Sequence, residues 1–298
     1  MSDGLKTCAV MTMVYQDYMF LERFVDYYAA QIGRDNIYVI SHGNDPRHRD
    51  IADGCNILSF PRDPQINAFD RRRWTALSSF ASGLSQFYRW VITSDVDEFV
   101  LLDPAVGDSL PAYLEAKWPG LEDAPASICP FAIEPIHRPE DEPLPIEADA
   151  PILSRRRIYR PNANYCKPCI TRGAVRFTPG GHANTLGKRY LSDDLYLLHL
   201  RFFDRDYVTR RLNLRADQIR NLDWITDEQK ASHGWTHSLD EYLDAARWPI
   251  EDGDLRHPAM RKQMVTRQQQ RPGTQIWGWG RTAGQSLYRL PDRFADLV

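Results

Sequence analysis

Short apolar runs alternate with segments of helical spacing over the first hundred residues. Apolar runs over 7–14, 36–41 and 56–60 predict three buried strands. Between them, apolar side chains recur every three or four residues, which predicts one helix closed by Gly33 and another capped by Asp70. The apolar positions are Phe20, Leu21, Phe24, Val25, Tyr28 and Ile32 in the first helix, and Trp74, Leu77, Phe80, Ala81, Leu84 and Phe87 in the second. This alternation predicts an α/β protein whose mostly parallel sheet is flanked by helices.

A further apolar run, over 90–102, is interrupted by Asp95, Asp97 and Glu98. Its β-branched and aromatic residues predict a strand buried on both faces, with the acids emerging at its end. In an extended chain, side chains alternate, so Asp95 and Asp97 are expected on one side. Two carboxylates held that close repel each other and favour a hard divalent cation. The pattern predicts a site for Mn²⁺ or Mg²⁺.

Polar residues follow three of the predicted strands, at 15–17, 41–45 and 95–98. Ligands of such sheets bind at the carboxyl ends of the strands, so these segments are expected to form one site that includes Ser41. Three arginines at 71–73 precede the second helix. We expect Arg73 to meet an anion there and the other two to lie in a solvated first turn.

The second half of the chain predicts a helix over 108–118 and a strand over 126–133. His182 follows two glycines in a turn, where the backbone can approach a ligand closely. His199 lies in an apolar strand; such a histidine is usually a core residue, but beside an acidic site it becomes a candidate metal ligand. After about residue 205 the pattern is mainly helical. We therefore expect a nucleotide-binding and catalytic domain over 1–205 and a helical extension over 206–298.

The composition narrows the function further. The 298 residues carry a net charge of −3, which argues against a general nucleic-acid binder. Five cysteines give no disulfide framework, and Cys166 and Cys169 are best interpreted as ordinary thiols. The apolar stretches are too short to span a bilayer and the first residues do not resemble a signal peptide. We expect a cytoplasmic protein, free or peripheral at the inner face of the membrane, and the sequence leaves its oligomeric state open.

Several segments in this order resemble a known group of enzymes. They are the first strand and helix, the Asp95-Val-Asp97-Glu98-Phe99 motif in its apolar context, a later Lys-Pro pair, the Gly-His turn, and His199-Leu-Arg. Together, over about residues 7–205, they are similar to the family 2-like glycosyltransferases of GT-A fold. The similarity extends to a bacterial branch with an Asp-x-Asp-Glu-Phe motif that also resembles family 92. The resemblance implies a Rossmann-like sheet and a DXD metal motif.

Carried over to this sequence, the resemblance implies a metal bound by Asp95, Asp97 and His199 that bridges the diphosphate of a UDP- or GDP-sugar. It also implies that the base and ribose lie near Thr12, Tyr15 and Asp17. Relatives commonly have Lys-Asn-Glu where this chain has Tyr-Gln-Asp at 15–17, which leaves the nucleotide open. The donor-binding positions expected overall are Thr12, Tyr15, Asp17, Ser41, Arg73, Asp95 and His182.

The implied activity is metal-dependent, inverting transfer of a sugar to a glycan or other hydroxyl acceptor in glycan or polysaccharide synthesis. Inversion needs a carboxylate base, and Glu134, Asp193 and Asp194 are the candidates. One alternative is a catalytically silent nucleotide-sugar or carbohydrate-binding protein on the same fold. Another is a haloacid-dehalogenase-like phosphohydrolase, which is disfavoured because its paired aspartates follow the first strand.

Overall fold

The computed structural model describes residues 4–62, 68–147, 149–223, 225–231, 237–279 and 284–298. The strands are β1 (Lys6–Val14), β2 (Ile37–His42), β3 (Asn56–Phe60), β4 (Tyr88–Thr93), β5 (Glu98–Leu102), β6 (Ser127–Pro135), β7 (Ile158–Pro161), β8 (Ile170–Thr171), β9 (Tyr190–His199), β10 (Gln269–Gln270), β11 (Trp277–Gly278) and β12 (Tyr288–Arg289). The helices are α1 (Tyr18–Ile32), α2 (Pro46–Ile51), α3 (Phe69–Leu84), α4 (Leu110–Lys117), α5 (Arg205–Arg220), α6 (Asp227–Ala231), α7 (Ser238–Ala245) and α8 (Pro258–Thr266).

One large sheet organises the molecule, in the order β12-β7-β6-β8-β4-β1-β2-β3, with β9 pairing to both β5 and β6. The four strands β3, β2, β1 and β4 are parallel, and β6 and β9 are parallel as well. The other pairs in this sheet are antiparallel. The predicted α/β fold, a largely parallel sheet flanked by helices, is confirmed, with antiparallel pairs in its second half.

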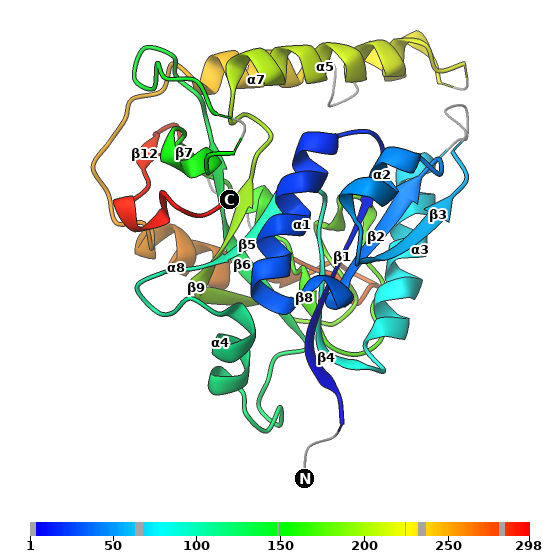
Figure 1. Cartoon of the computed structure of the whole chain (residues 1–298). Coiled ribbons are helices and arrows are strands. Elements are labelled where there is room, and N and C mark those ends of the chain that lie inside the picture. The colour runs from blue at the N-terminus through cyan, green and yellow to red at the C-terminus, as the bar shows by residue number, and fades with distance from the viewer. Residues whose placement is uncertain (1–3, 63–67, 148, 224, 232–236, 280–283) are drawn as a thin grey trace.

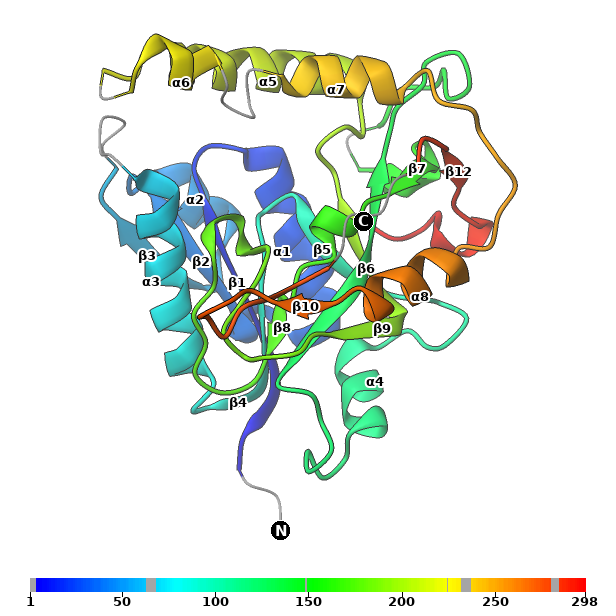
Figure 2. The same ribbon diagram turned by 180° about the vertical axis from the view of Figure 1, so that it is seen from behind.

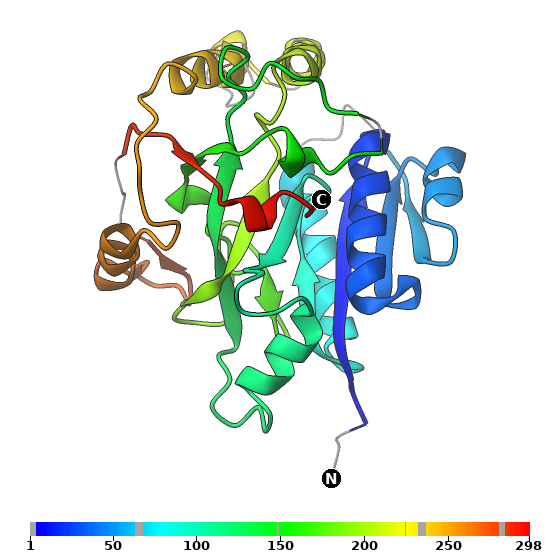
Figure 3. The same ribbon diagram turned by 60° about the vertical axis from the view of Figure 1, so that its left-hand side comes forward.

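The central strand β1 shows why helices cover both faces. Its successive side chains point to opposite sides. Val10 belongs to the same apolar cluster as Phe24 of α1, whereas Met11 belongs to the cluster that holds Trp74 of α3. Figures 1 and 3 show α1 on one face of the sheet and α3 on the other. Both faces of β1 are therefore dry, as its largely apolar run predicts.

The prediction of a single strand over 90–102 is wrong. The chain forms β4, turns, and returns as β5, which runs antiparallel to β9. Asp95 and Asp97 lie in this turn, so their positions do not follow strand alternation. The acids do emerge at the end of a buried strand, β4, as expected. The turn was missed because Val96 and Phe99 are buried too and continue the apolar pattern.

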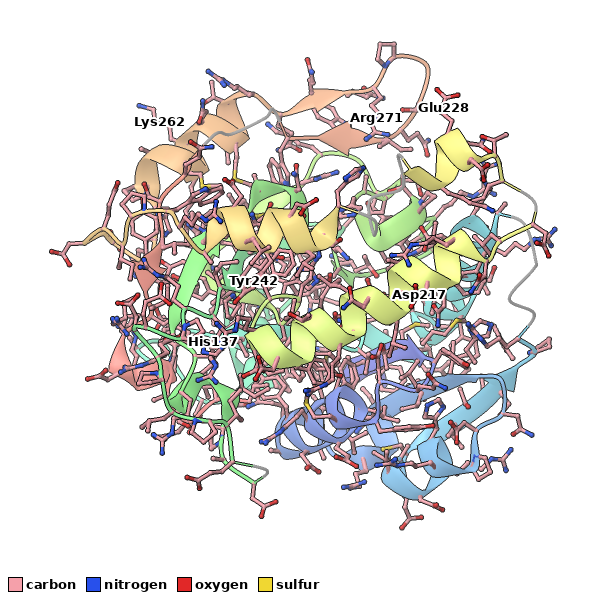
Figure 4. The ribbon with its side chains drawn as sticks, turned by 90° about the horizontal axis from the view of Figure 1, so that it is seen from above. His137, Asp217, Glu228, Tyr242, Lys262 and Arg271 are labelled. Carbon is pink, nitrogen blue, oxygen red and sulfur yellow. The ribbon has the colours of Figure 1, made fainter. Side chains whose placement is uncertain are left out.

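The C-terminal part of the chain is mainly helical but also extends the sheet. Figures 1 and 2 show α5 and α7 lying across one end of the molecule, above the sheet. The two helices share an apolar cluster that includes Leu212 and Tyr242, and the Tyr242 hydroxyl donates to the carbonyl of His137, 2.7 Å away (Figure 4). Strand β12 then pairs with β7. In the described part of the chain, every helix is too short or too polar to cross a membrane.

Candidate active site

The strand order predicts a ligand site outside the ends of β1 and β4. The chain leaves β1 towards β2 on one side, while β4 lies on the other side, so the connections diverge at this point. Ligands of parallel sheets bind where the strand order reverses, outside the carboxyl ends of the strands. Tyr15 and Asp17 follow β1, and Asp95 and Asp97 follow β4. Arg211 joins the first and third of the predicted polar segments by binding Asp17 and Asp97. The second segment supplies Gly43 and Asn44 to the cavity described below.

The backbone after β1 is strained. Gln16 and Asp17 both adopt left-handed conformations, with φ angles of 55° and 41°. For residues other than glycine this conformation costs about 1–2 kcal/mol each. Asp17 occupies the N-cap position of α1 without capping the helix. Its carboxylate instead accepts hydrogen bonds from Arg211 Nε and Nη2, at 3.1 and 3.0 Å, and from Arg215 Nη2 at 3.1 Å.

Oppositely charged side chains fill the space outside these strand ends. Arg211 Nη1 also donates to Asp97 Oδ2, at 2.8 Å, and so joins the ends of β1 and β4. Asp95 binds Arg73 through one oxygen and Lys167 Nζ, at 3.2 Å, through the other. Lys167 Nζ lies 2.5 Å from Glu98 Oε1. We call these eight residues the charged cluster: Asp17, Arg73, Asp95, Asp97, Glu98, Lys167, Arg211 and Arg215.

The pKa values reflect competition between burial and these partners. Burial alone would raise the pKa of Asp97, but Arg211 and His199 outweigh it and lower the pKa to about 2. Burial opposes ionisation of Asp95 as well, yet Arg73 and Lys167 hold its pKa well below the usual range. For Glu98 burial prevails over the attraction of Lys167, and its pKa is raised. The two aspartates of the motif are therefore ionised at neutral pH.

His199 lies between the charged cluster and the carboxylate of Glu134. Its Nε2 is 4.0 Å from Asp97 Oδ2 and 3.9 Å from Glu98 Oε1, while its Nδ1 is 3.0 Å from Glu134 Oε1. Glu134 is completely buried and also accepts from Arg160 Nε at 2.6 Å. A carboxylate in this position orients the imidazole. Because the Glu134 side chain is buried, an acceptor sugar cannot reach its carboxylate. Its position therefore does not support the expectation that it acts as the catalytic base.

The residues expected to bind a divalent ion do not fit one in this arrangement. Carboxylates and imidazole suit Mn²⁺ chemically. However, Asp95 and Asp97 are already paired with basic side chains, and His199 lies 4.0 Å from the nearer of them. Among the described residues, no three His, Cys, Asp or Glu side chains lie close enough to hold a metal ion.

A cavity of about 740 Å³ opens beside the charged cluster. It is lined by Tyr15, Gly43, Asn44, Arg49, Ser59, Phe60, Pro61, Arg62 and Gln218. The Arg62 guanidinium lies 3.4 Å from the centre of the Tyr15 ring, a close cation–π contact. Two elements contribute to both the cavity and the charged cluster: Tyr15 is two residues before Asp17, and Gln218 is three residues after Arg215.

Four predicted site residues belong neither to the lining of the cavity nor to the charged cluster. Thr12 is buried within β1. Ser41 is buried as well, and its hydroxyl lies 2.8 Å from His48 Nδ1, where it supports the start of α2. Asp194 pairs with Lys117 Nζ at 3.0 Å and, like Asp193, lies near the start of β9. Five residues of strand, about 17 Å, separate Asp194 from His199 at its end. Asp193 and Asp194 therefore lie away from the site, whereas Thr12 and Ser41 are buried in the strands that lead to it.

The remaining prediction concerns the turn at His182, which lies on the rim of the site. The His182 ring is exposed and meets the edge of Tyr165, with ring centres 5.4 Å apart. Tyr165 in turn packs on His199, with ring centres 4.2 Å apart.

Among the three arginines at 71–73, Arg73 belongs to the charged cluster, while Arg71 and Arg72 are exposed.

Sequence reasoning did not assign Lys167, Arg211 or Arg215 to the site. Lys167 lies between the two cysteines of a C-x-x-C pattern, and the arginines lie on a polar helix far along the chain. The one available signal was spacing, since residues 211 and 215 are four apart and must share a helix face. This spacing does not show which residues that face of the helix contacts.

No protein-family model matches the sequence, and no curated protein matches it. The mannosyltransferase PcManGT from Pyrobaculum calidifontis, in complex with GDP-Man and Mn²⁺, is 12% identical over 87% of this chain and 79% of its own, with a TM-score of 0.36. A mannose-1-phosphate geranyltransferase from Thermus thermophilus is 14% identical over 76% and 67%, with a TM-score of 0.29. A CMP:2-keto-3-deoxy-manno-octonic acid synthetase complexed with CTP is 13% identical, with a TM-score of 0.26; the match covers 45% of this chain and 55% of the synthetase. Likeness at this level carries no argument about function.

Proposed function

We propose that this chain transfers a sugar from a nucleotide-diphosphate donor, a UDP- or GDP-sugar, to a hydroxyl acceptor with inversion, in glycan or polysaccharide synthesis. One observation carries the proposal: a cluster of buried basic side chains at the switch point of the sheet, continuous with an open cavity walled by Tyr15 and Arg62. Such an arrangement suits a ligand with an aromatic base at one end and a diphosphate at the other.

The cavity suits the nucleoside. Its volume of about 740 Å³ lies within the range typical of small-molecule sites. Tyr15 offers an aromatic face on which a base can stack, and Asn44 and Ser59 offer polar groups that can hydrogen-bond its edge. The diphosphate would then lie beyond Tyr15, towards the charged cluster.

Lys167 and Arg211 of the charged cluster can receive the departing diphosphate when it displaces the carboxylates that pair with them. As the sugar leaves, negative charge develops on the diphosphate oxygen, and fixed cations in a dry site stabilise it strongly. Lys167 and Arg211 are buried and held in place by Asp95, Asp97 and Asp17. In this proposal Asp95 and Asp97 therefore serve to position the basic side chains Lys167 and Arg211. No step passes through a metal ion, because the residues as folded do not fit one.

The alternatives differ in what they need from these acids. A phosphohydrolase of the haloacid-dehalogenase type needs a nucleophilic aspartate after the first strand, whereas Asp95 follows β4 and has both oxygens paired. No observation favours it. A silent nucleotide-sugar-binding protein has the same cavity and cluster, so only a turnover measurement separates it from a transferase.

The test combines binding with turnover. Thermal shifts are measured with UDP, GDP and their sugars, and nucleotide release is measured with and without acceptor sugars, each with Mn²⁺, with Mg²⁺ and with EDTA. We expect one nucleotide series to raise the melting temperature and its sugar to be turned over. Binding without turnover would support the silent protein, and the absence of any nucleotide binding would refute both hypotheses. Comparing the assays with Mn²⁺, Mg²⁺ and EDTA shows separately whether the protein needs a divalent metal ion.

A matched pair of lysine variants locates the diphosphate. Lys167→Met removes a buried cation of the cluster, whereas Lys188→Met removes an exposed lysine on a neighbouring loop. We expect the first to weaken nucleotide-diphosphate binding at least about tenfold, equivalent to about 1.4 kcal/mol, and the second to have no effect. Equal affinities for the two variants would contradict the proposed position of the diphosphate.

A further inference from the structure

The ring of His182 has a defined tautomer. Its Nδ1 lies 2.9 Å from the carbonyl oxygen of Asn164. A carbonyl can only accept a hydrogen bond, so Nδ1 carries the proton and Nε2 keeps its lone pair. His182 is an exposed residue, and Nε2 is the ring nitrogen that can accept a proton from a bound molecule.

The turn that carries His182 is built around this ring. Gly180 has a φ angle of 72°, and a Cβ atom there would lie 2.6 Å from Cδ2 and 2.8 Å from Nε2 of His182. A Cβ atom on Gly181 would lie 2.4 Å from Trp74. Arg189 Nη2 donates to the His182 carbonyl at 2.8 Å. The ring therefore packs on Gly180, and the turn that carries it packs through Gly181 against α3, the helix from which Arg73 reaches Asp95.

The surroundings keep the ring neutral. Burial of its inner side, and then the charge of Lys167, lower the pKa of His182 to about 4. The Asn164 carbonyl and Asp95 oppose this shift, and His199 adds to it. A neutral imidazole can accept a proton over the whole physiological range. A diphosphate bound on the cluster would add negative charge near the ring, and nearby negative charge raises the pKa of an imidazole.

We propose that His182 is the general base for the acceptor hydroxyl, an inference that rests on the proposed inverting transfer. The hydroxyl proton passes to Nε2 as the acceptor oxygen forms its bond to the anomeric carbon of the donor. The bond from that carbon to the diphosphate oxygen breaks, and the diphosphate leaves with the electron pair. The imidazolium then releases its proton to solvent.

The carboxylates expected to act as base are not open to this role. Glu134 is buried behind His199, and Asp193 and Asp194 lie near the other end of β9. His182 is an exposed residue, its Nδ1 is held by the Asn164 carbonyl, and its ring contacts Tyr165, which packs on His199.

The experiment compares His182→Asn and His182→Gln with His237→Asn, which replaces an exposed histidine that makes no side-chain cap to α7. Transfer rate against pH, donor affinity and melting temperature are measured for each, using the donor and acceptor that the wild-type protein turns over. We expect both His182 variants to lower kcat about 100-fold or more, to keep donor affinity within about threefold, and to lose the acidic limb of the pH profile.

Two results would overturn the base assignment. One is a kcat within about threefold of the wild-type value in either folded His182 variant. The other is a loss of donor affinity as large as the loss of rate, which would make the ring a donor contact. If the wild-type protein neither binds nor turns over any nucleotide sugar, the proposed function itself fails, and the base assignment fails with it.

Discussion

Arg211 should be the residue of the charged cluster on which stability depends most. It reaches from α5 to two carboxylates, Asp97 at 2.8 Å and Asp17 at 3.0 and 3.1 Å, and is itself buried. Replacing it by methionine keeps a long apolar stem but leaves Asp97 buried without its main counter-charge. Arg215 still reaches Asp17, so Asp97 carries most of the effect.

The size of the effect follows from the pKa of Asp97. Its folded value of about 2 lies below the ordinary value of 3.8. A depressed carboxyl pKa stabilises the fold above the unfolded value and loses that contribution as the pH falls through the folded value. This lowering of the pKa corresponds to about 2 kcal/mol at neutral pH. Breaking a buried ion pair by removing one partner typically costs about 3–5 kcal/mol, so we expect a loss of about 2–5 kcal/mol.

Urea denaturation at pH 7.5, and at steps down to pH 3.5, tests this reasoning. Arg210→Met, on the exposed side of the same helix, is the control and should cost less than about 0.5 kcal/mol. We expect the deficit of Arg211→Met to narrow below about pH 4, where the unfolded chain takes up its protons. Adding Asp97→Asn to Arg211→Met should recover part of the loss. Equal stability of the two arginine variants at pH 7.5 would refute the role of the pair.

Three further substitutions test the packing and the cavity. Phe99→Ala, in the core, should lower the free energy of unfolding by about 3–5 kcal/mol in urea, whereas Phe87→Ala, with 69% of that residue exposed, should change it by less than about 0.5 kcal/mol. Gly181→Ala should lower the melting temperature far more than Gly173→Ala; both have positive φ, but only the first meets another side chain, Trp74. Tyr15→Ala should weaken nucleotide binding about 5- to 150-fold in calorimetry, whereas Tyr15→Phe should bind nearly as well as wild type. Equal affinities of Tyr15→Ala and wild type would mean that the nucleobase does not stack on Tyr15.

The elements of the first hundred residues were predictable because their periods are unambiguous. From Cys8 to Val14, β1 is buried on both faces and is apolar except for Thr12, and α1 repeats its apolar side chains with helical spacing. The same signal failed at 90–102, where both arms of a turn are buried and the turn residue Val96 is buried with them. Helix α2 was also missed, since its six residues are too few to show a period.

The acids of the site were predictable, but most of their partners were not. Asp95 and Asp97 stand out because charge is costly inside an apolar run. Lys167 and Arg211 come from segments 72 and 114 residues away from the acids they bind. Periodicity is a local property and does not report such pairings. This is also why Glu134 was expected to act as a base: the sequence shows the carboxylate but not the Arg160 and His199 that enclose it.

The cost of this arrangement is itself an argument for function. Buried ion pairs are often no more stabilising than apolar residues of similar volume, and the chain adds two left-handed residues, Gln16 and Asp17, to bring one of these pairs together. A chain selected only for stability would close the end of β1 with glycine and place apolar side chains beside it. Here strain and buried charge coincide at the switch point of the sheet, where a ligand is expected on topology alone. The proposed diphosphate, by replacing the carboxylates that bind Lys167 and Arg211, would give this buried charge a function.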